Sequence, residues 1–185
     1  MSEKTKYIVF TAGVSPQTIG KLREAIVQAV NGRYTELYIL LSSSGGDVNE
    51  GLALAALLRS LPVKVVMHNI GQIDSVANVI FAAGHTRYAQ ANASFLFHGV
   101  LLNLNQTQML ESQLNEAYKN CVRLREDIAK YFSSYTGIDL AQVTALMVDG
   151  ATILNAEQAR AKGIVNEIGE PKIPAGTQII GIGNA

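Results

Sequence analysis

Three glycine- and serine-containing segments of the chain could together form a covalent hydrolytic site. They read SSSGGDV at 42–48, GQIDSVAN at 71–78 and SFLFHGV at 94–100. A serine such as Ser75 is a weak nucleophile until a base takes its proton, and His98 is a candidate for that base. The oxyanion that forms next needs fixed N–H donors, which a Gly-Gly turn can supply because no side chain blocks the approach. These residue types predict nucleophilic catalysis.

Each segment follows an apolar or β-branched run that is typical of a buried strand: LYILL, VKVVMHNI and SFLF. We therefore expect Gly45, Gly46, Ser75 and His98 at the strand ends of one sheet, where sites of α/β proteins gather. Two plainer interpretations remain open. A serine between a strand and a helix is typical of a helix N-cap, and a histidine at a strand end is often only a hydrogen-bonded polar residue.

The elements that must position these residues alternate between strand and helix patterns. A helix beginning at Ser15 has a capping serine followed by Pro16 at its first helical position. Repeated units with continuous apolar strands predict an α/β fold wound as a right-handed spiral. The expected strands are 7–10, 37–41 and 63–69, and the expected helices start at Ser15 and span 49–61 and 76–83.

A longer helix is expected from about 107 to 135, with apolar residues spaced alternately by four and three positions. Such a stripe packs one seam either against its own domain or against a partner helix, and the pattern alone does not choose. Cys121 is interpreted as a small apolar residue of the seam. The stripe consists of Leu110, Leu114, Ala117, Cys121, Leu124, Ile128, Tyr131 and Tyr135.

Length and composition exclude several classes of protein. The 185 residues, 48% of them hydrophobic, predict a single domain over 1–185. Lys plus Arg and Asp plus Glu both number 15, so no overall field favours nucleic acid or an anionic membrane. One cysteine forms no intrachain disulfide and fits a reducing compartment. The sequence shows neither a signal-peptide core nor a membrane-spanning run, so we expect a cytoplasmic protein without cofactor or metal.

The order of these motifs resembles the proteolytic subunit of the Clp protease, a self-compartmentalising serine peptidase of the crotonase-like fold. The similarity runs from about Tyr7 to about Ile168 and includes ILNAEQARAKGIVNEI near the end of that range. It implies a ClpP-like spiral of strand-helix units from which the 107–135 helix projects as a handle. It also implies stacked rings, sevenfold, that enclose a chamber for peptide or unfolded protein substrates.

The resemblance assigns the nucleophile to Ser75, the base to His98 and the oxyanion hole to the backbone N–H groups of Gly46 and Val76. Ser44 stands where the family usually has proline, and Ala77 where it has glycine. Asp74 stands where the family has a small apolar residue, and a negative charge there opposes the formation of an oxyanion.

The third member of the expected triad has no direct match, because Ala151 falls where the family has its aspartate. Asp149 is the candidate, since the loop through Gly150 could bring its carboxylate to His98. An Asp-Gly pair is also typical of a simple turn. A Ser-His dyad, an orienting asparagine such as Asn155, or loss of activity are the alternatives.

Two other functions stay open. The Asp74 charge and the unmatched aspartate would suit a catalytically impaired structural or regulatory ring subunit. The crotonase-like fold also contains acyl-CoA enzymes, but no pair of glutamates accompanies Gly46 and Val76. The segment before Tyr7 is shorter than the family's axial gate, which argues against an ATPase unfoldase partner without excluding it. The apolar, glycine-rich tail 173–185 is expected to add an edge strand or an interface.

Overall fold

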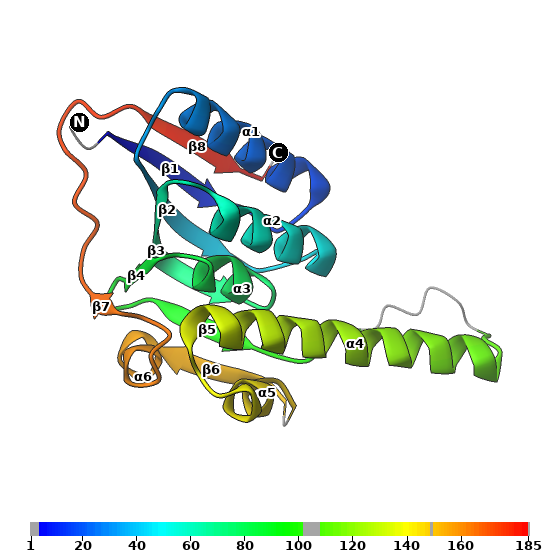
Figure 1. Cartoon of the computed structure of the whole chain (residues 1–185). Coiled ribbons are helices and arrows are strands. Elements are labelled where there is room, and N and C mark those ends of the chain that lie inside the picture. The colour runs from blue at the N-terminus through cyan, green and yellow to red at the C-terminus, as the bar shows by residue number, and fades with distance from the viewer. Residues whose placement is uncertain (1–3, 102–107, 149, 185) are drawn as a thin grey trace.

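A largely parallel sheet forms the centre of the computed structural model, which describes residues 4–101, 108–148 and 150–184 (Figure 1). Its strands are β1 (Thr5–Thr11), β2 (Glu36–Ser43), β3 (Lys64–Asp74), β4 (Thr86–Ala89), β5 (Ser94–Phe97), β6 (Thr152–Asn155), β7 (Glu167–Ile168) and β8 (Ile179–Gly183). The order along the main path is β6-β5-β3-β2-β1-β8, with β4 beside β3 and β7 beside β4. Only β5 and β6 are antiparallel among the described strand pairs.

The helices are α1 (Pro16–Asn31), α2 (Val48–Ser60), α3 (Ala77–Ala82), α4 (Glu111–Thr136), α5 (Leu140–Val148) and α6 (Ala156–Ala161). Helices α1, α2 and α3 cover one face of the sheet, whereas α5 and α6 lie at its β6 end (Figure 1). Alternating strands and helices with parallel pairing confirm the predicted α/β fold. The predicted start of α1 is also confirmed, because Ser15 and Thr18 form a capping box and Pro16 opens the helix.

Strand β3 is longer than the predicted 63–69 segment, because it continues to Asp74. Its first part lies between β2 and β4, and its last part, from Gln72 to Asp74, pairs with β5. The register with β2 shifts after Leu41, so that Ser43 faces Ile73. The apolar pattern is interrupted at this irregularity, which is why the sequence predicted too short a strand.

The two halves of α4 lie in different surroundings. In the second half Leu124, Ile128 and Phe132 are buried within the chain, and the Phe132 ring meets Phe97 edge-on at 5.4 Å between centroids. The first half projects beyond the other elements (Figure 1). Its apolar side chains are open, with Leu110 69%, Leu114 47% and Tyr118 64% exposed. The Ile128 end of the stripe therefore packs against its own domain and is not available to a partner helix. The helix begins at Glu111, and residue 107, its expected start, lies outside the described residues.

The face of the sheet opposite α1 carries a row of aromatic rings. Tyr38 stacks on Tyr7, and His68 lies between Tyr38 and Tyr88. The Tyr38 hydroxyl donates to His68 Nδ1 at 2.7 Å, and His68 Nε2–H donates to the carbonyl of Gly169 at 2.9 Å. Burial lowers the pKa of His68 and raises the pKa of Tyr38 to about 12.

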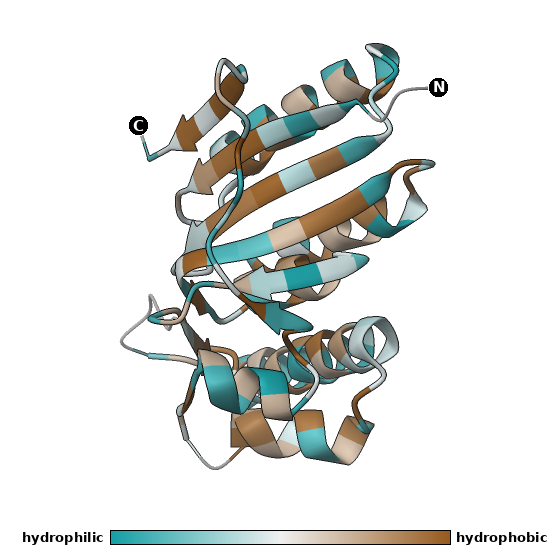
Figure 2. Cartoon of the chain, turned by 90° about the vertical axis from the view of Figure 1, so that its left-hand side faces the viewer, coloured by the Kyte–Doolittle hydropathy of each residue, from teal (hydrophilic) through white to brown (hydrophobic). Residues whose placement is uncertain are grey.

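The segment between β7 and β8 crosses this same face (Figure 2), and β8 then runs along β1 so that the chain ends near the carboxyl end of that strand. Strand β8 pairs in parallel with β1, Tyr7 opposite Ile179 and Thr11 opposite Gly183. The Gly13 N–H also donates to Asn184 Oδ1 at 2.9 Å. The predicted edge strand in the tail is thus confirmed.

Candidate active site

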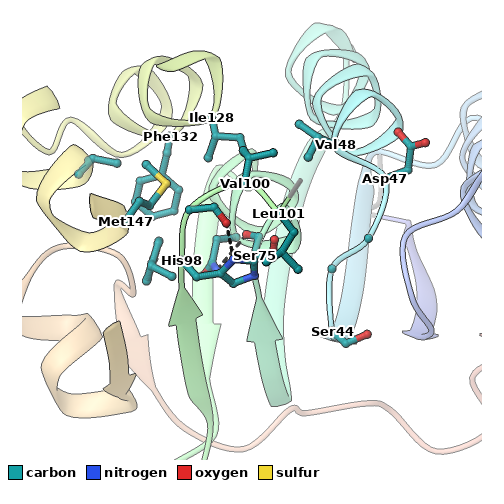
Figure 3. Close-up of a pocket in the computed structure, with 16 residues that line it drawn as sticks. Ser44, Asp47, Val48, Ser75, His98, Val100, Leu101, Ile128, Phe132 and Met147 are labelled. Atoms are coloured by element: carbon teal, nitrogen blue, oxygen red, sulfur yellow. Dashed lines mark hydrogen bonds between the residues drawn. The ribbon is translucent and has the colours of Figure 1, made fainter. Parts of the chain in front are cut away.

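The candidate residues follow three neighbouring strands and border one cavity of about 550 Å³ (Figure 3). Gly45 and Gly46 come after β2, Ser75 directly follows β3, and His98 directly follows β5. Because β2, β3 and β5 run parallel, their carboxyl ends meet at one edge of the sheet. The structure therefore brings together the glycine pair, the serine and the histidine named from the sequence.

Ser75 has a left-handed backbone, with φ of 56°. A non-glycine residue in this region costs on the order of 1–3 kcal/mol and persists only where its surroundings fix it. Here the Ser75 N–H donates to the Leu96 carbonyl at 2.8 Å. The buried Asn78 amide donates to the carbonyls of Ser75, at 3.1 Å, and of Leu96, at 2.8 Å. The N-cap of α3 is Val76, so the N-cap interpretation of Ser75 is wrong.

The Gly45-Gly46 turn is possible only without side chains. Gly45 has φ of 77°, and a Cβ there would lie 2.7 Å from Ser75 Cβ. Gly46 has φ of 144°, and a Cβ there would lie 2.2 Å from the Val14 carbonyl. The flanking backbone is fixed by hydrogen bonds from Val14 N to Gly45 O at 2.7 Å and from Asp47 N to Val14 O at 2.8 Å. The turn is therefore held rigidly against the nucleophile.

The His98 ring is oriented by a backbone carbonyl. Its Nδ1 lies 2.5 Å from the Gly99 oxygen. A carbonyl can only accept a hydrogen bond, so Nδ1 carries the proton in that contact. In the neutral ring Nε2 then keeps its lone pair, which is the state that a general base requires.

The proposed third residue, Asp149, lies outside the described residues. Its described neighbours Val148, Gly150 and Ala151 border a second cavity that His98 also lines. Asn155, the alternative orienter, instead caps α6 by accepting from the Gln158 N–H at 2.9 Å. It pairs with Ser94 at the end of β5 remote from His98. Asn155 therefore has a structural role.

Asp74 is half-buried beside the site. Burial raises the pKa of its carboxyl, and the nearby His98 ring lowers it by a smaller amount. Its Oδ2 accepts from the Gln72 side-chain amide at 3.2 Å. The charge is thus held close enough to act on His98, a relationship that the sequence did not reveal.

An apolar wall borders the cavity, and most of its residues lie outside the three motifs, in α4, in α5 or at Leu101 (Figure 3). Sequence reasoning missed this wall, because the patterns of α4 and α5 predict core positions and give no sign that the core borders a cavity. The wall consists of Val48, Phe97, Val100, Leu101, Ile128, Phe132, Val143 and Met147.

Comparison with known proteins decides the family. A family model described as Clp protease matches residues 3–172. The chain belongs to the Clp protease family. The ATP-dependent Clp protease proteolytic subunit 2 of Pseudomonas aeruginosa is 26% identical over 167 residues, covering 89% of this chain and 81% of that protein. The subunit of the same name from Treponema denticola is 23% identical, with 89% and 82% covered.

Solved structures agree on the fold. A point mutant of ClpP1 from Listeria monocytogenes superposes with a TM-score of 0.76 at 20% identity, covering 89% of this chain and 92% of that one. The chain therefore has the crotonase-like fold of ClpP, as the sequence predicted. Family membership supports a serine peptidase function.

The described residues contain neither a helix long and apolar enough to cross a membrane nor a group of three or more His, Cys, Asp or Glu side chains that could hold a metal ion.

Proposed function

We propose that this Clp family member is a serine endopeptidase in which Ser75 is the nucleophile and His98 the general base. The observation that carries the proposal is the shared cavity of Ser75, His98 and the glycine turn. Ser75 Oγ would add to the carbonyl carbon of a peptide while its proton moves to His98 Nε2. That proton would then pass to the leaving amine as the C–N bond breaks. Water would hydrolyse the resulting acyl-enzyme by the same route.

Two backbone N–H groups are proposed to stabilise the oxyanion, those of Gly46 and Val76. Gly46 borders the cavity and its turn is rigid. Val76 directly follows the nucleophile at the start of α3, where backbone N–H groups lack partners within the helix. Donors that are fixed before the reaction contribute several kcal/mol, because they need no reorganisation in the transition state.

The histidine must also be oriented. We propose Asp149 for this role, supported by the position of its described neighbours Val148, Gly150 and Ala151 beside His98. The Gly99 carbonyl already selects the required tautomer in the unliganded chain. Asp149→Asn should therefore reduce turnover strongly, by up to about 10⁴-fold as in serine proteases, while Asn155→Ala should leave turnover close to that of the parent protein.

The substrate is proposed to be a peptide or an unfolded protein that presents an apolar side chain. The cavity wall around Ile128, Phe132 and Met147 is apolar, so it favours burial of such a side chain beside the scissile bond. Peptides with a large apolar residue before the scissile bond should be hydrolysed faster than those with an acidic one.

A homo-oligomeric chamber is proposed on the basis of family membership and the first half of α4. That half presents Leu110, Leu114 and Tyr118 to solvent in the single chain. Exposed apolar side chains along a projecting helix favour association. We propose stacked rings, sevenfold, whose handle helices pair across the rings in the cytoplasm. An ATPase unfoldase partner belongs to the same proposal.

Labelling by a fluorophosphonate probe, read by intact mass, tests the peptidase proposal. The parent protein should gain one adduct, and Ser75→Ala should gain none and hydrolyse no fluorogenic peptide. His98→Ala should remain folded and lose labelling by several orders of magnitude. Undiminished labelling of Ser75→Ala would refute the assignment. An assembled parent protein that never labels would support the impaired ring subunit instead.

A further inference from the structure

Asp74 and His98 lie on adjacent strands and on the same face of the sheet. Asp74 is the register partner of Leu96 in the parallel pair of β3 and β5. Along β5, Phe95 and Phe97 are buried whereas Leu96 and His98 are half-buried, so the last two share the face opposite the core. His98 directly follows β5, two residues beyond the register partner of Asp74, and the charge of the ring acts on the Asp74 carboxyl.

The Asp74 carboxylate is fixed and partly withdrawn from water. Gln72, two residues earlier on the same strand face, donates to Asp74 Oδ2 at 3.2 Å. Burial raises the pKa of the carboxyl, so its charged form is unfavourable in the folded chain. The electrostatic partner of Asp74 is His98. A partly buried carboxylate beside a proposed catalytic base indicates that its negative charge contributes to function.

Other charged or titratable groups face His98 from the elements packed around it. Asp47, at the start of α2, lines the main cavity, and Tyr118, Cys121 and Arg125 of α4 line the second one. Of these groups Asp47 is an anion and Arg125 a cation, and the Asp74 carboxylate belongs to β3.

We infer that Asp74 is a positioning residue that stabilises the protonated His98 ring during acylation and deacylation. The inference rests on the proposed peptidase function. When the Ser75 proton moves to His98 Nε2, the ring becomes a positively charged imidazolium. The Asp74 carboxylate offsets the new charge without exchanging a proton. The role resembles that of the acid in a catalytic triad, although the carboxylate comes from the residue before the nucleophile.

The same carboxylate also repels the developing oxyanion. Stabilisation of the imidazolium speeds the reaction and repulsion of the oxyanion slows it, so replacing Asp74 by the neutral asparagine shows which effect is larger. In Asp74→Asn the Gln72 hydrogen bond can persist, because the asparagine side chain keeps an acceptor oxygen. If stabilisation of the imidazolium dominates, peptide hydrolysis and fluorophosphonate labelling should both slow, by roughly 3- to 10-fold in kcat/KM at the plateau of the pH profile.

The pH profile provides a readout that a structural role would not change. The base must be neutral to accept the proton, and a neighbouring negative charge favours the protonated ring. Asp74→Asn should therefore move the acid limb of kcat/KM toward lower pH. Asp139→Asn is the matched control, since Asp139 caps α5 through Ala141 N at 2.9 Å and asparagine caps equally well. Its profile should equal that of the parent protein.

Diethyl pyrocarbonate modification of His98, read by peptide mass, makes the test independent of catalysis. The reagent attacks only the neutral imidazole, so the pH of half-maximal modification should fall in Asp74→Asn and stay constant in Asp139→Asn. A shift here without any labelling of Ser75 would place the failure in the peptidase proposal. Unchanged pH dependence in both assays, or a faster Asp74→Asn enzyme, would overturn the role of Asp74.

Discussion

Replacing Gly45 by alanine tests whether the rigid turn positions the nucleophile. Two effects add at this site. With φ of 77°, an alanine costs about 1–2 kcal/mol because the left-handed region brings Cβ too close to the backbone. The new Cβ would also lie 2.7 Å from both Ser75 Cβ and the Asp74 carbonyl, so at least one of them must move.

Overpacking of this kind costs typically about 1–3 kcal/mol. The free energy of unfolding of Gly45→Ala should therefore fall by about 2–5 kcal/mol. Gly137, the C-cap of α4, has the same φ of 77° and no atom within 4 Å of an added Cβ. Gly137→Ala should lose only the conformational part, about 1–2 kcal/mol. The difference between the two variants isolates the contact with Ser75.

Urea denaturation followed by circular dichroism gives the two stabilities, and the rate of fluorophosphonate labelling reports on the nucleophile. Displacement of a reacting group by about 1 Å can cost 10²-fold in rate. We expect labelling to fall by about that factor in Gly45→Ala and by less than about twofold in Gly137→Ala. Equal labelling rates in the two folded variants would refute the claim that the turn positions Ser75.

Three further predictions concern assembly, pH and the support of the nucleophile. Leu114→Glu should leave the subunit folded, because Leu114 is 47% exposed in the single chain. If a partner subunit buries this side chain, the introduced charge should weaken association by several kcal/mol and reduce the sedimenting mass. An unchanged mass would exclude a subunit contact at Leu114. Burial lowers the pKa of His68 below the ordinary 6.5, so the unfolded chain binds the proton more readily than the folded chain does. The free energy of unfolding should therefore decrease as the pH falls below about 6.5. His68→Gln should flatten that dependence in urea titrations, although His85, whose pKa burial also lowers, retains part of it. Asn78→Ala should destabilise the fold by about 1–3 kcal/mol, because two carbonyls lose their buried donor, and should slow labelling of Ser75; parent-like values in both assays would mean that the left-handed Ser75 is held by other contacts.

Local patterns predicted most elements of the fold. Continuous apolar runs marked β2 and most of β3, and the Ser15-Pro16 pair marked the start of α1, since these signals depend on neighbouring residues. The end of β3 was missed because pairing with β5 extends it, which is a tertiary effect. The heptad-like stripe of α4 predicted a buried seam. It could not show that Ile128 is buried within its own chain while Leu114 stays exposed to solvent.

The candidate site also combines features that the sequence predicted with features that depend on long-range contacts. Ser75, His98 and the glycine pair follow strands directly, so their convergence was predictable from the parallel order. The effect of Asp74 on His98 depends on the register of β3 with β5, and no single-sequence signal carries register. The apolar wall depends on how α4 and α5 return to the sheet, which is also a long-range property.

The pairing of β1 with β8 has a consequence for how the protein is made. The Gly13–Asn184 hydrogen bond joins residues 171 positions apart, and the strand pair beside it is equally distant in sequence. At ribosomal speeds of about 5–20 residues per second, the N-terminal strand emerges roughly 10–30 s before its partner exists. During that interval one edge of β1 offers unpaired backbone groups to any other nascent chain. Chains that terminate before Ile179 leave the seven-residue β1, rather than the five-residue β8, at the edge of the sheet, so translational truncation should expose a longer template for aggregation.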